Sequence, residues 1–344
     1  MTDSVQSKLI ISSANAAEDL SEEIADELET GVAFELRQVV VPVGGHGERL
    51  DRALAQAVPE FSRSYLQQLI AAGAVQLNGA TVTKSAGRVK AGNTLQVELK
   101  PTPQSQAFKP EAMALEIVFE DEHLLVVNKP AGLVVHPAPG NWSGTLLNGL
   151  LGRDPLASLL PRAGIVHRLD KDTSGLMVVA RKRQVMDQLV AMIAARTVSR
   201  EYLALAHGDW QGPAARQVED PIGRDPRNRL RMAVVDLERN SGKTASTGIF
   251  RLGSDGGFCL VRCKLQTGRT HQIRVHMAAI GHPLVADEVY GGKPAAGLAR
   301  QALHACRLAF EHPVTGEALE FLSPLPADLA AAVAGVGLGY NQSQ

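Results

Sequence analysis

The sequence contains few aromatic residues and few cysteines, and both shortages restrict its possible functions. Aromatic side chains make up 4% of the 344 residues, so few of them are free to stack on bases or sugars. Three cysteines, Cys259, Cys263 and Cys306, are too few for a disulfide framework and lack the paired Cys/His spacing of a zinc site. We therefore expect reduced core thiols, no bound metal and a cytoplasmic protein.

Long apolar runs and a secretory signal are also missing. No stretch of 18 apolar residues is present, so no membrane-spanning helix is expected. The N-terminus lacks the basic and apolar regions of a signal peptide. The apolar content of 45% is instead sufficient for a full core, and the length suits two domains.

Charge is distributed unevenly along the chain. Residues 1–36 carry nine acidic side chains against the single Lys8, a net charge of −8, and this leaves +7 for the remainder of a chain whose total is −1. The acidic, aromatic-poor start is typical of disorder, and the basic remainder favours a polyanionic partner. Charge alone equally allows a solvated basic surface.

Residues 44–100 have the pattern of a small α+β unit. Apolar residues recur at helical spacing over 47–55, and Ser62 precedes a second predicted helix over 63–72. Asn78-Gly79 is a strong hairpin turn between two short strands, and a further strand is predicted over 94–99.

The rest of the chain predicts a larger domain rich in strands. Strands are expected at 116–120, 124–128, 201–206, 258–265, 303–310 and 318–322, with few long helices and no regular βαβ alternation. This pattern favours an α+β fold with a mixed, mainly antiparallel central sheet. The predicted order is an acidic disordered leader at 1–43, the small domain at 44–100, a proline-bearing linker at 101–113, the larger domain at 114–327 and a frayed tail at 328–344.

A polar loop inside an apolar stretch, residues 164–180, is the strongest candidate for an active site. Asp170 lies between Arg168 and Lys171, with buried-type segments on both sides. A carboxylate in a half-buried loop needs a cation to stay ionised. Arg269 or Arg274, in the second arginine-rich motif at 268–277, is a candidate. The alternative is an ordinary helix start with structural arginines, capped by Thr270, and the residues alone do not decide between the two.

Three motifs in combination resemble the RluA family of RNA pseudouridine synthases. They are Asn-Lys-Pro-Ala-Gly-Leu-Val-Val-His-Pro at 128–137, His-Arg-Leu-Asp-Lys-Asp-Thr-Ser-Gly at 167–175, and Leu-Gln-Thr-Gly-Arg-Thr-His-Gln-Ile-Arg-Val-His-Met at 265–277. The resemblance spans about 45–325, and its small domain resembles the S4 RNA-binding domain. Within the family, Val-His-Pro-Ala-Pro-Gly-Asn at 135–141 makes the chain most similar to the RluD type.

This resemblance implies isomerisation of uridine to pseudouridine without cofactor or metal. It implies that Asp170 is the nucleophile, that Arg274 pairs with it, and that Tyr202 stacks on the uracil and helps to remove its C5 proton. A uridine in a stem must be extruded to be modified, and Arg168 matches the residue that fills the gap left by the base.

The resemblance also implies a large-subunit (23S) ribosomal RNA substrate, free or in a pre-50S particle, with target uridines in the helix 69 stem-loop. The protein is expected to be monomeric, and His167 to shape the loop rather than to titrate. Residues expected to contact the substrate are His167, Arg168, Arg224, Arg269 and the small-domain arginines Arg49, Arg52 and Arg63.

Parts of the sequence also resemble the features of three other kinds of protein. A phosphate-binding loop ending in Lys243-Thr244 is excluded, because Leu237 occupies the position of its first glycine. A non-catalytic RNA-binding protein using only the small domain stays possible on sequence alone. A glycosidase would need a second carboxylate, and Asp172 is available but nothing marks it for that role.

Overall fold

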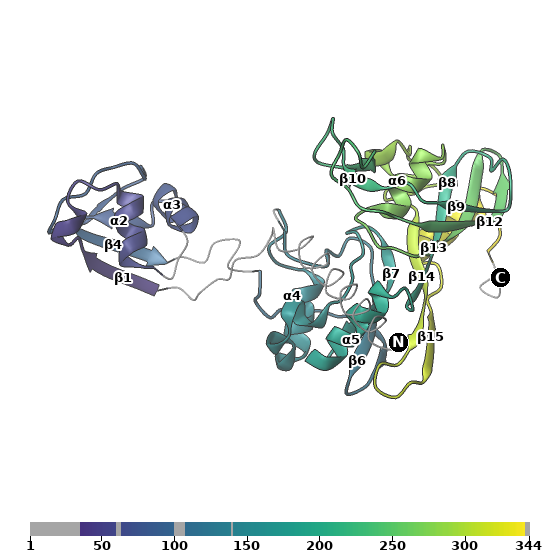
Figure 1. The fold of residues 1–344 in the computed structure, drawn as a ribbon, viewed down its shortest axis with the longest axis horizontal. Coiled ribbons are helices and arrows are strands. Elements are labelled where there is room, and N and C mark those ends of the chain that lie inside the picture. The colour runs from purple at the N-terminus through teal and green to yellow at the C-terminus, as the bar shows by residue number, and fades with distance from the viewer. Residues whose placement is uncertain (1–34, 60–62, 100–106, 139, 341–344) are drawn as a thin grey trace, which may run out of the picture. The chain divides into compact units, whose positions relative to one another are not determined.

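The computed structural model describes residues 35–59, 63–99, 107–138 and 140–340 (Figure 1). Its contacts divide the chain into two compact units, one over Glu29–Lys109 and a larger one that contains Pro110–Gln344. The predicted linker at 101–113 therefore ends too late. Within it, Glu111 already belongs to the larger unit, because its N–H donates to the carbonyl of Asn148 and its carboxylate accepts from the Gly144 N–H.

The smaller unit packs helices against a sheet. Among its described residues, the sheet order is β1 (Glu35–Val40), β4 (Thr94–Leu99), β2 (Val75–Leu77), β3 (Ala80–Thr81), and the helices are α2 (Leu50–Ala57) and α3 (Arg63–Ala71), with a short 3-10 turn, η1, at Val43–Gly45. Side chains such as Leu54, Leu66, Ile70 and Val97 form its core. The predicted hairpin at Asn78-Gly79 is confirmed, with φ of 52° and 81° at the two residues.

Strand β1 corrects the prediction of a disordered leader as far as residue 43. Residues 35–40 pair antiparallel with β4, from Glu35 opposite Leu99 to Val40 opposite Thr94. Leu36 and Val40 are each 59% exposed, so backbone pairing rather than a buried apolar face holds this edge strand. The sequence signal of such a strand is weak. The rest of the predicted leader, residues 1–34, lies outside the described residues.

The larger unit is built on a mixed, mainly antiparallel sheet, as predicted (Figure 1). Among the described residues its strands run in the order β5-β6-β7-β14-β8-β13-β12-β9, and β15 also pairs with β14. Of the strand pairs that the described residues form in this sheet, only β7–β14 is parallel. The strands are Glu116–Glu120 (β5), Leu124–Lys129 (β6), Ser174–Ala180 (β7), Ser199–His207 (β8), Ala215–Val218 (β9), Thr247–Asp255 (β12), Phe258–Leu265 (β13), Leu303–Glu311 (β14) and Ala318–Leu322 (β15).

Helices pack against this sheet and complete its hydrophobic cores. They are α4 (Leu146–Arg153), α5 (Arg183–Ala194), α6 (Gln272–Ala279) and α7 (Ala327–Gly335), with 3-10 turns η3 (Pro155–Leu159), η4 (Pro161–Gly164) and η5 (Glu288–Tyr290). Strand β7 is buried along its whole length, which explains its unbroken apolar sequence. The parallel crossing with β14 requires glycine at 175, because a Cβ there would lie 2.2 Å from the carbonyl oxygen of Ala305.

Helix α7 corrects the prediction of a frayed tail from residue 328. Leu329, Ala332 and Val333 are buried against apolar residues of β8 and β13. Burial of these side chains stabilises the helix, since an isolated nine-residue helix would be marginal in water. The Gly/Asn/Gln-rich ending that suggested fraying begins only beyond this helix.

Candidate active site

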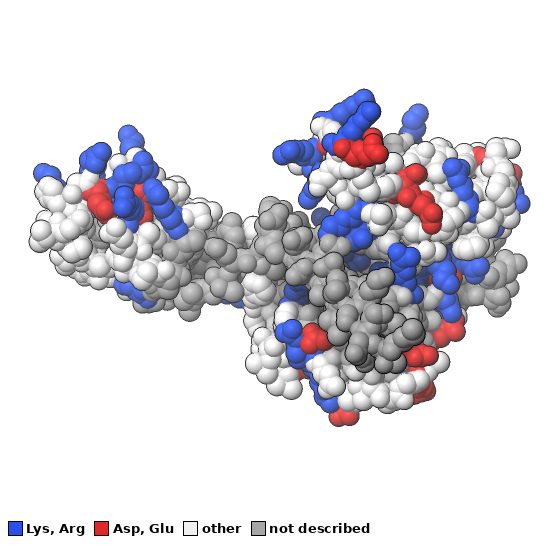
Figure 2. All heavy atoms as spheres, in the orientation of Figure 1, with Lys and Arg blue, Asp and Glu red and all other residues white. Residues whose placement is uncertain are grey.

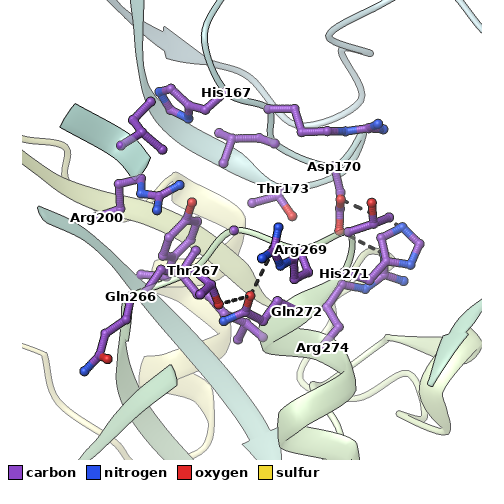
Figure 3. Close-up of a pocket in the computed structure, with 18 of the residues that line it drawn as sticks. His167, Asp170, Thr173, Arg200, Gln266, Thr267, Arg269, His271, Gln272 and Arg274 are labelled. Atoms are coloured by element: carbon purple, nitrogen blue, oxygen red, sulfur yellow. Dashed lines mark hydrogen bonds and ion pairs between the residues drawn. The ribbon is translucent and has the colours of Figure 1, made fainter. Parts of the chain in front are cut away.

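A pocket of about 210 Å³ opens beside the loop that precedes β7. Most of its wall comes from three segments far apart in the sequence, namely residues 165–170, the start of β8, and residues 265–274, which lead from β13 into α6. The end of α5 and single residues such as His136, Thr244 and Leu303 also line it. Figure 3 shows side chains of these segments around one space. The fold thus brings together Asp170, Tyr202 and Arg274, which come from three segments far apart in the sequence.

Arg274 links Asp170 to a second carboxylate. Its Nη1 donates to Asp170 Oδ2 at 3.0 Å, while its Nε and Nη2 donate to Asp287 at 2.7 and 2.8 Å. The side chains of Asp170, Arg274 and Asp287 are 16%, 7% and 1% exposed. A two-pronged guanidinium–carboxylate contact fixes orientation as well as charge. Asp287 therefore aims the remaining donor of Arg274 at Asp170, and the predicted Asp170–Arg274 pair is present.

Two rings complete the surroundings of this pair. The guanidinium of Arg274 lies over the Tyr290 ring, 5.0 Å from its centre, and the Tyr290 hydroxyl bonds His271 Nδ1 at 2.8 Å. Burial alone would lower the pKa of Arg274, but its bonds to Asp287 and Asp170 outweigh burial and raise that pKa. Arg274 therefore stays a cation beside the carboxylate of Asp170 at any working pH.

The start of helix α6 differs from an ordinary cap. Its N-cap is His271, in the left-handed conformation at φ 56°, and the cap makes no side-chain hydrogen bond, so the alternative cap at Thr270 is wrong. Instead Gln272 is buried and accepts from the Arg269 N–H, while its amide donates to Ser246 O and Thr247 Oγ1. The left-handed turn directs His271 toward Asp170, with Nε2 3.8 Å from Oδ1.

Lys129 anchors the far side of the Asp170 loop. Its side chain is 1% exposed, and Nζ donates to the carbonyls of Pro130, Leu133 and Lys171 at 2.8 to 3.0 Å. Burial lowers the pKa of Lys129 to about 7, although the carboxylates of Asp170 and Asp172 act in the opposite direction. The loop is also held through Arg300, which donates to the Asp172 carbonyl.

Tyr202 lies on β8 within the pocket wall. It is 5% exposed, and burial, together with the negative charge of Asp170, raises its pKa to about 12 despite the opposing effect of Arg200. The ring is therefore a neutral phenol at pH 7. This state suits stacking on a base, and it supplies no ready phenolate to accept a proton.

His167 and Arg168 both line the pocket but in different ways. His167 is buried, and its Nε2 accepts the backbone N–H of Val178 at 3.1 Å. Burial, with the nearby charge of Arg200, lowers the pKa of His167 to about 3, so the ring is neutral and holds the loop against β7. Arg168 is exposed at the pocket, and Arg269 lies opposite with its Nε donating to Thr244 O.

Comparison with known proteins identifies the family. A family model described as RNA pseudouridylate synthase matches residues 123–279, and an S4 domain model matches 48–95. Ribosomal large subunit pseudouridine synthase D of Neisseria meningitidis is 46% identical over 329 residues, covering 92% of this chain and 86% of the relative. The protein of that name from Nitrosomonas europaea is 47% identical over 302 residues, covering 86% of each chain.

The chain belongs to the RNA pseudouridine synthase family. Human RNA pseudouridylate synthase domain containing 1 has the same fold, with a TM-score of 0.50 and 29% identity over 65% of this chain and 90% of its own. The predicted family, the pseudouridine synthase fold and the N-terminal S4 domain are thus confirmed.

In the S4 domain, two of the predicted RNA-binding arginines hold a buried acid. Asp51 is fully buried at the start of α2 and accepts from Arg49 Nε at 3.1 Å, Arg63 Nη2 at 2.8 Å and Gln67 Nε2 at 2.6 Å. The hydrogen bond from Arg49 and the other contacts hold the pKa of Asp51 far below its usual range. Arg49 and Arg63 thus stabilise the helix pair, with side chains still about half exposed.

Arg52 is less constrained than these two residues. Its side chain is 64% exposed, and Nε lies 3.5 Å from Glu48 of the preceding turn. Figure 2 shows Lys and Arg side chains gathered on one side of the S4 domain. Of the three predicted RNA contacts in this domain, Arg52 therefore contributes least to holding the fold together.

Arg224 lies away from the pocket lining. It ends β10 (Ile222–Arg224), which pairs antiparallel with β11 (Met232–Val234) to form a basic hairpin. Figure 2 shows basic side chains projecting near this hairpin. Arg231 pairs with Asp225 at 2.7 Å, and this contact closes the hairpin loop, whose Leu230 is 90% exposed.

The described residues contain no group of three or more His, Cys, Asp and Glu side chains placed to hold a metal ion. In the same part of the chain no helix is long and apolar enough to cross a membrane. The three cysteines are free and buried, as expected, and burial raises the pKa of Cys259 and Cys306 to about 12.

Four side chains of the site were not predicted from the sequence: Lys129, Arg200, His271 and Asp287. Lys129 and His271 lie inside quoted motifs, but neither motif reveals which side chain is buried. Asp287 follows α6 by eight residues and has no motif of its own. The signal that could have indicated Asp287 is the need of Arg274, the second arginine of 268–277, for a second carboxylate.

Proposed function

We propose that this protein isomerises specific uridines of large-subunit (23S) ribosomal RNA to pseudouridine, in the helix 69 stem-loop. The observation that carries the proposal is the Asp170–Arg274 pair, 3.0 Å apart, in a pocket that Tyr202 also lines. The relatives named ribosomal large subunit pseudouridine synthase D support the choice of RNA. The net charge of +7 beyond residue 36 suits a polyanionic substrate.

Asp170 is the nucleophile in this proposal. Pseudouridine formation breaks the C1′–N1 bond of uridine, rotates the base and joins C5 to C1′. The proton lost from C5 is balanced by one gained at N1, so the product is an isomer and no redox partner is needed. The hydrogen bond from Arg274 holds Asp170 aimed at the sugar. Tyr202 stacks on the uracil as a neutral ring, because its pKa is raised to about 12.

The target uridine has to leave its stem to enter the pocket. Arg168, exposed at the pocket, fills the space that the base vacates, since a guanidinium plane stacks well on neighbouring bases. Arg269 and the hairpin residue Arg224 contact the phosphate backbone, as do Arg49, Arg52 and Arg63 of the S4 domain. The protein acts as a cytoplasmic monomer on free RNA or a pre-50S particle, without cofactor.

Mapping of pseudouridine tests the proposed substrate. Unmodified large-subunit RNA transcript is incubated with the purified protein, treated with carbodiimide and read by reverse transcription. New stops at uridines of helix 69 are expected. Stops confined to other uridines would reject the helix 69 assignment, and no stops in either free RNA or isolated large-subunit precursors would favour a non-catalytic RNA-binding protein.

A further inference from the structure

One buried arginine in the pocket, Arg200, makes no ion pair with any residue that the structure describes. Arg200 is 6% exposed, and its Nε makes no hydrogen bond within the described part of the chain. Burial of a guanidinium is costly unless its donors are satisfied. Burial also lowers the pKa of Arg200, with only the Tyr202 oxygen acting against that shift. A ligand that enters the pocket would supply the missing acceptor.

The acids near Arg200 are engaged elsewhere. Arg200 and Tyr202 are two residues apart on β8, so their side chains share the face that lines the pocket. Glu201, on the opposite face, bonds Arg307 at 2.8 Å. Asp170, on another segment of the pocket wall, accepts from Arg274. The strand therefore places the Arg200 guanidinium and the Tyr202 ring side by side, and neither Glu201 nor Asp170 pairs with that guanidinium.

Gly268 leaves space for this guanidinium. A Cβ at position 268 would lie 2.8 Å from Arg200 Nη1, closer than ordinary Cβ contacts. Because the obstructing atom is the end of a flexible side chain, an alanine would displace the guanidinium rather than break the backbone. The glycine of the second arginine motif thus fixes where the charge of Arg200 lies. Figure 3 shows Arg200 across the pocket from Asp170.

We propose that Arg200 donates to the carbonyl edge of the extruded uracil and stabilises the negative charge of the base once it detaches from the sugar. The inference rests on the proposed function. When C1′–N1 breaks, the electron pair leaves with the base, and the resulting uracil anion shares its charge among N1, O2 and O4. The charge is cancelled when C5 attacks C1′ and Asp170 is released from the sugar as a carboxylate. The C5 proton then leaves and N1 takes up a proton, so the product is neutral.

The uracil fits Arg200 better than a backbone phosphate does. Arg200 is buried beside Tyr202, the proposed stacking ring, whereas Arg168 and Arg196 are exposed at the pocket. Phosphates remain hydrated and run along the surface of a bound RNA, within reach of exposed arginines. A buried donor aimed at developing charge is worth about 10²–10³ in rate in comparable acyl-transfer sites.

Rates and affinities of Arg200→Gln and Arg200→Lys test the inference. With large-subunit RNA transcript, the single-turnover rate at saturating protein should fall roughly 100-fold for Arg200→Gln, and less for Arg200→Lys. The RNA Kd should stay within about twofold, with an unchanged salt slope. Arg183→Gln removes an equal charge at the far end of α5, where Arg183 pairs with Asp187, and should match the parent. A rate within threefold of the parent for Arg200→Gln would overturn the inference, as would a weaker Kd with a salt slope reduced by about one, which marks a phosphate contact.

The Gly268→Ala variant keeps the positive charge of Arg200 but displaces its guanidinium. It should lower the single-turnover rate while leaving the RNA Kd and the thermal midpoint near the parent values. This variant tests the position of the guanidinium even if Arg200→Gln does not fold. A parent-like rate in a variant of proven fold would overturn the inference.

A binding measurement keeps the inference separate from the proposed reaction. In protein labelled with ¹⁵N-arginine, the Nε–H signal missing from Arg200→Lys identifies Arg200. Millimolar uracil should shift this signal and inorganic phosphate should not. A signal that moves with phosphate alone, or with neither probe, would overturn the contact. If uracil shifts the signal but the parent forms no pseudouridine in any large-subunit substrate, the proposed function fails while the contact stands.

Discussion

Arg274 Nη1 lies 3.0 Å from Asp170 Oδ2, although 104 residues separate them in the chain. The contact joins the loop before β7 to helix α6, two segments that share no strand ladder with each other. Asp287 grips the other edge of the same guanidinium at 2.7 and 2.8 Å. Asp170, the proposed nucleophile, is therefore positioned through a buried arginine that a second, buried carboxylate holds.

Asp287→Asn should reduce the reaction rate without loss of RNA affinity. The variant keeps an acceptor but loses the charge that orients Arg274, and displacement of a catalytic group by about 1 Å costs on the order of 100-fold in rate. Single-turnover kinetics and filter binding measure the two quantities. Glu320→Gln, which removes an exposed partner of Arg307 on β15, is the matched control and should behave as the parent. Equal rates for Asp287→Asn and the control would show that Arg274 is oriented without the charge of Asp287.

Lys129 should make stability depend on pH in the alkaline range. Its folded pKa of about 7 lies below the unfolded value of 10.5, so between these values the unfolded chain binds more protons and the free energy of unfolding rises with pH. The rise is at most about 1.4 kcal/mol per pH unit. Relative to Lys129→Met, which cannot titrate, the parent should gain roughly 2 kcal/mol between pH 7.5 and 9.5 in urea unfolding. If the free energies of unfolding of the parent and Lys129→Met changed in parallel with pH, the three carbonyls would be keeping the Lys129 ammonium charged, contrary to this prediction.

Because of Asp51, the S4 domain should lose stability at acidic pH. Its folded pKa is depressed below the unfolded value of 3.8, so its stabilising contribution is complete above about pH 4 and is lost as the pH falls toward the folded pKa. Amide protection factors in α2 and α3 of the full chain should drop over this range. In Asp51→Asn they should be lower by roughly tenfold at pH 7 and nearly independent of pH below 4. A parent-like pH response in Asp51→Asn would contradict the assignment.

Arg52 and Arg49 should separate RNA contact from structural support. Arg52→Gln should reduce the slope of log K against log salt by about one, with the largest affinity loss at low salt and unchanged S4 protection. Arg49→Gln should also weaken α2 and α3, because it removes a partner of the buried Asp51. Filter binding from 50 to 300 mM salt, read beside hydrogen exchange, measures both. An unchanged slope in Arg52→Gln would remove it from the RNA interface.

The sequence predicted the parts of this molecule whose signals are local. The Asn78-Gly79 turn and the apolar strand β7 follow from short-range chemistry and pattern. Strand β1 and helix α7 were missed because each depends on a distant partner, β4 for one and the β8–β13 surface for the other. In the site, the motif resemblance supplied Asp170 and Arg274, but Asp287 and the unpaired Arg200 become visible only when burial and bond partners are known.

The most direct test of the central claim is a single substitution at the proposed nucleophile. Reverse-transcription mapping of carbodiimide-treated ribosomal RNA is performed in cells that lack the gene and carry the parent, Asp170→Asn or Asp172→Asn. Asp172 is the nearby carboxylate that a two-acid hydrolase would use. The parent and Asp172→Asn should restore the same pseudouridines, and Asp170→Asn should restore none while still binding RNA. Pseudouridines that persist with Asp170→Asn would contradict the account.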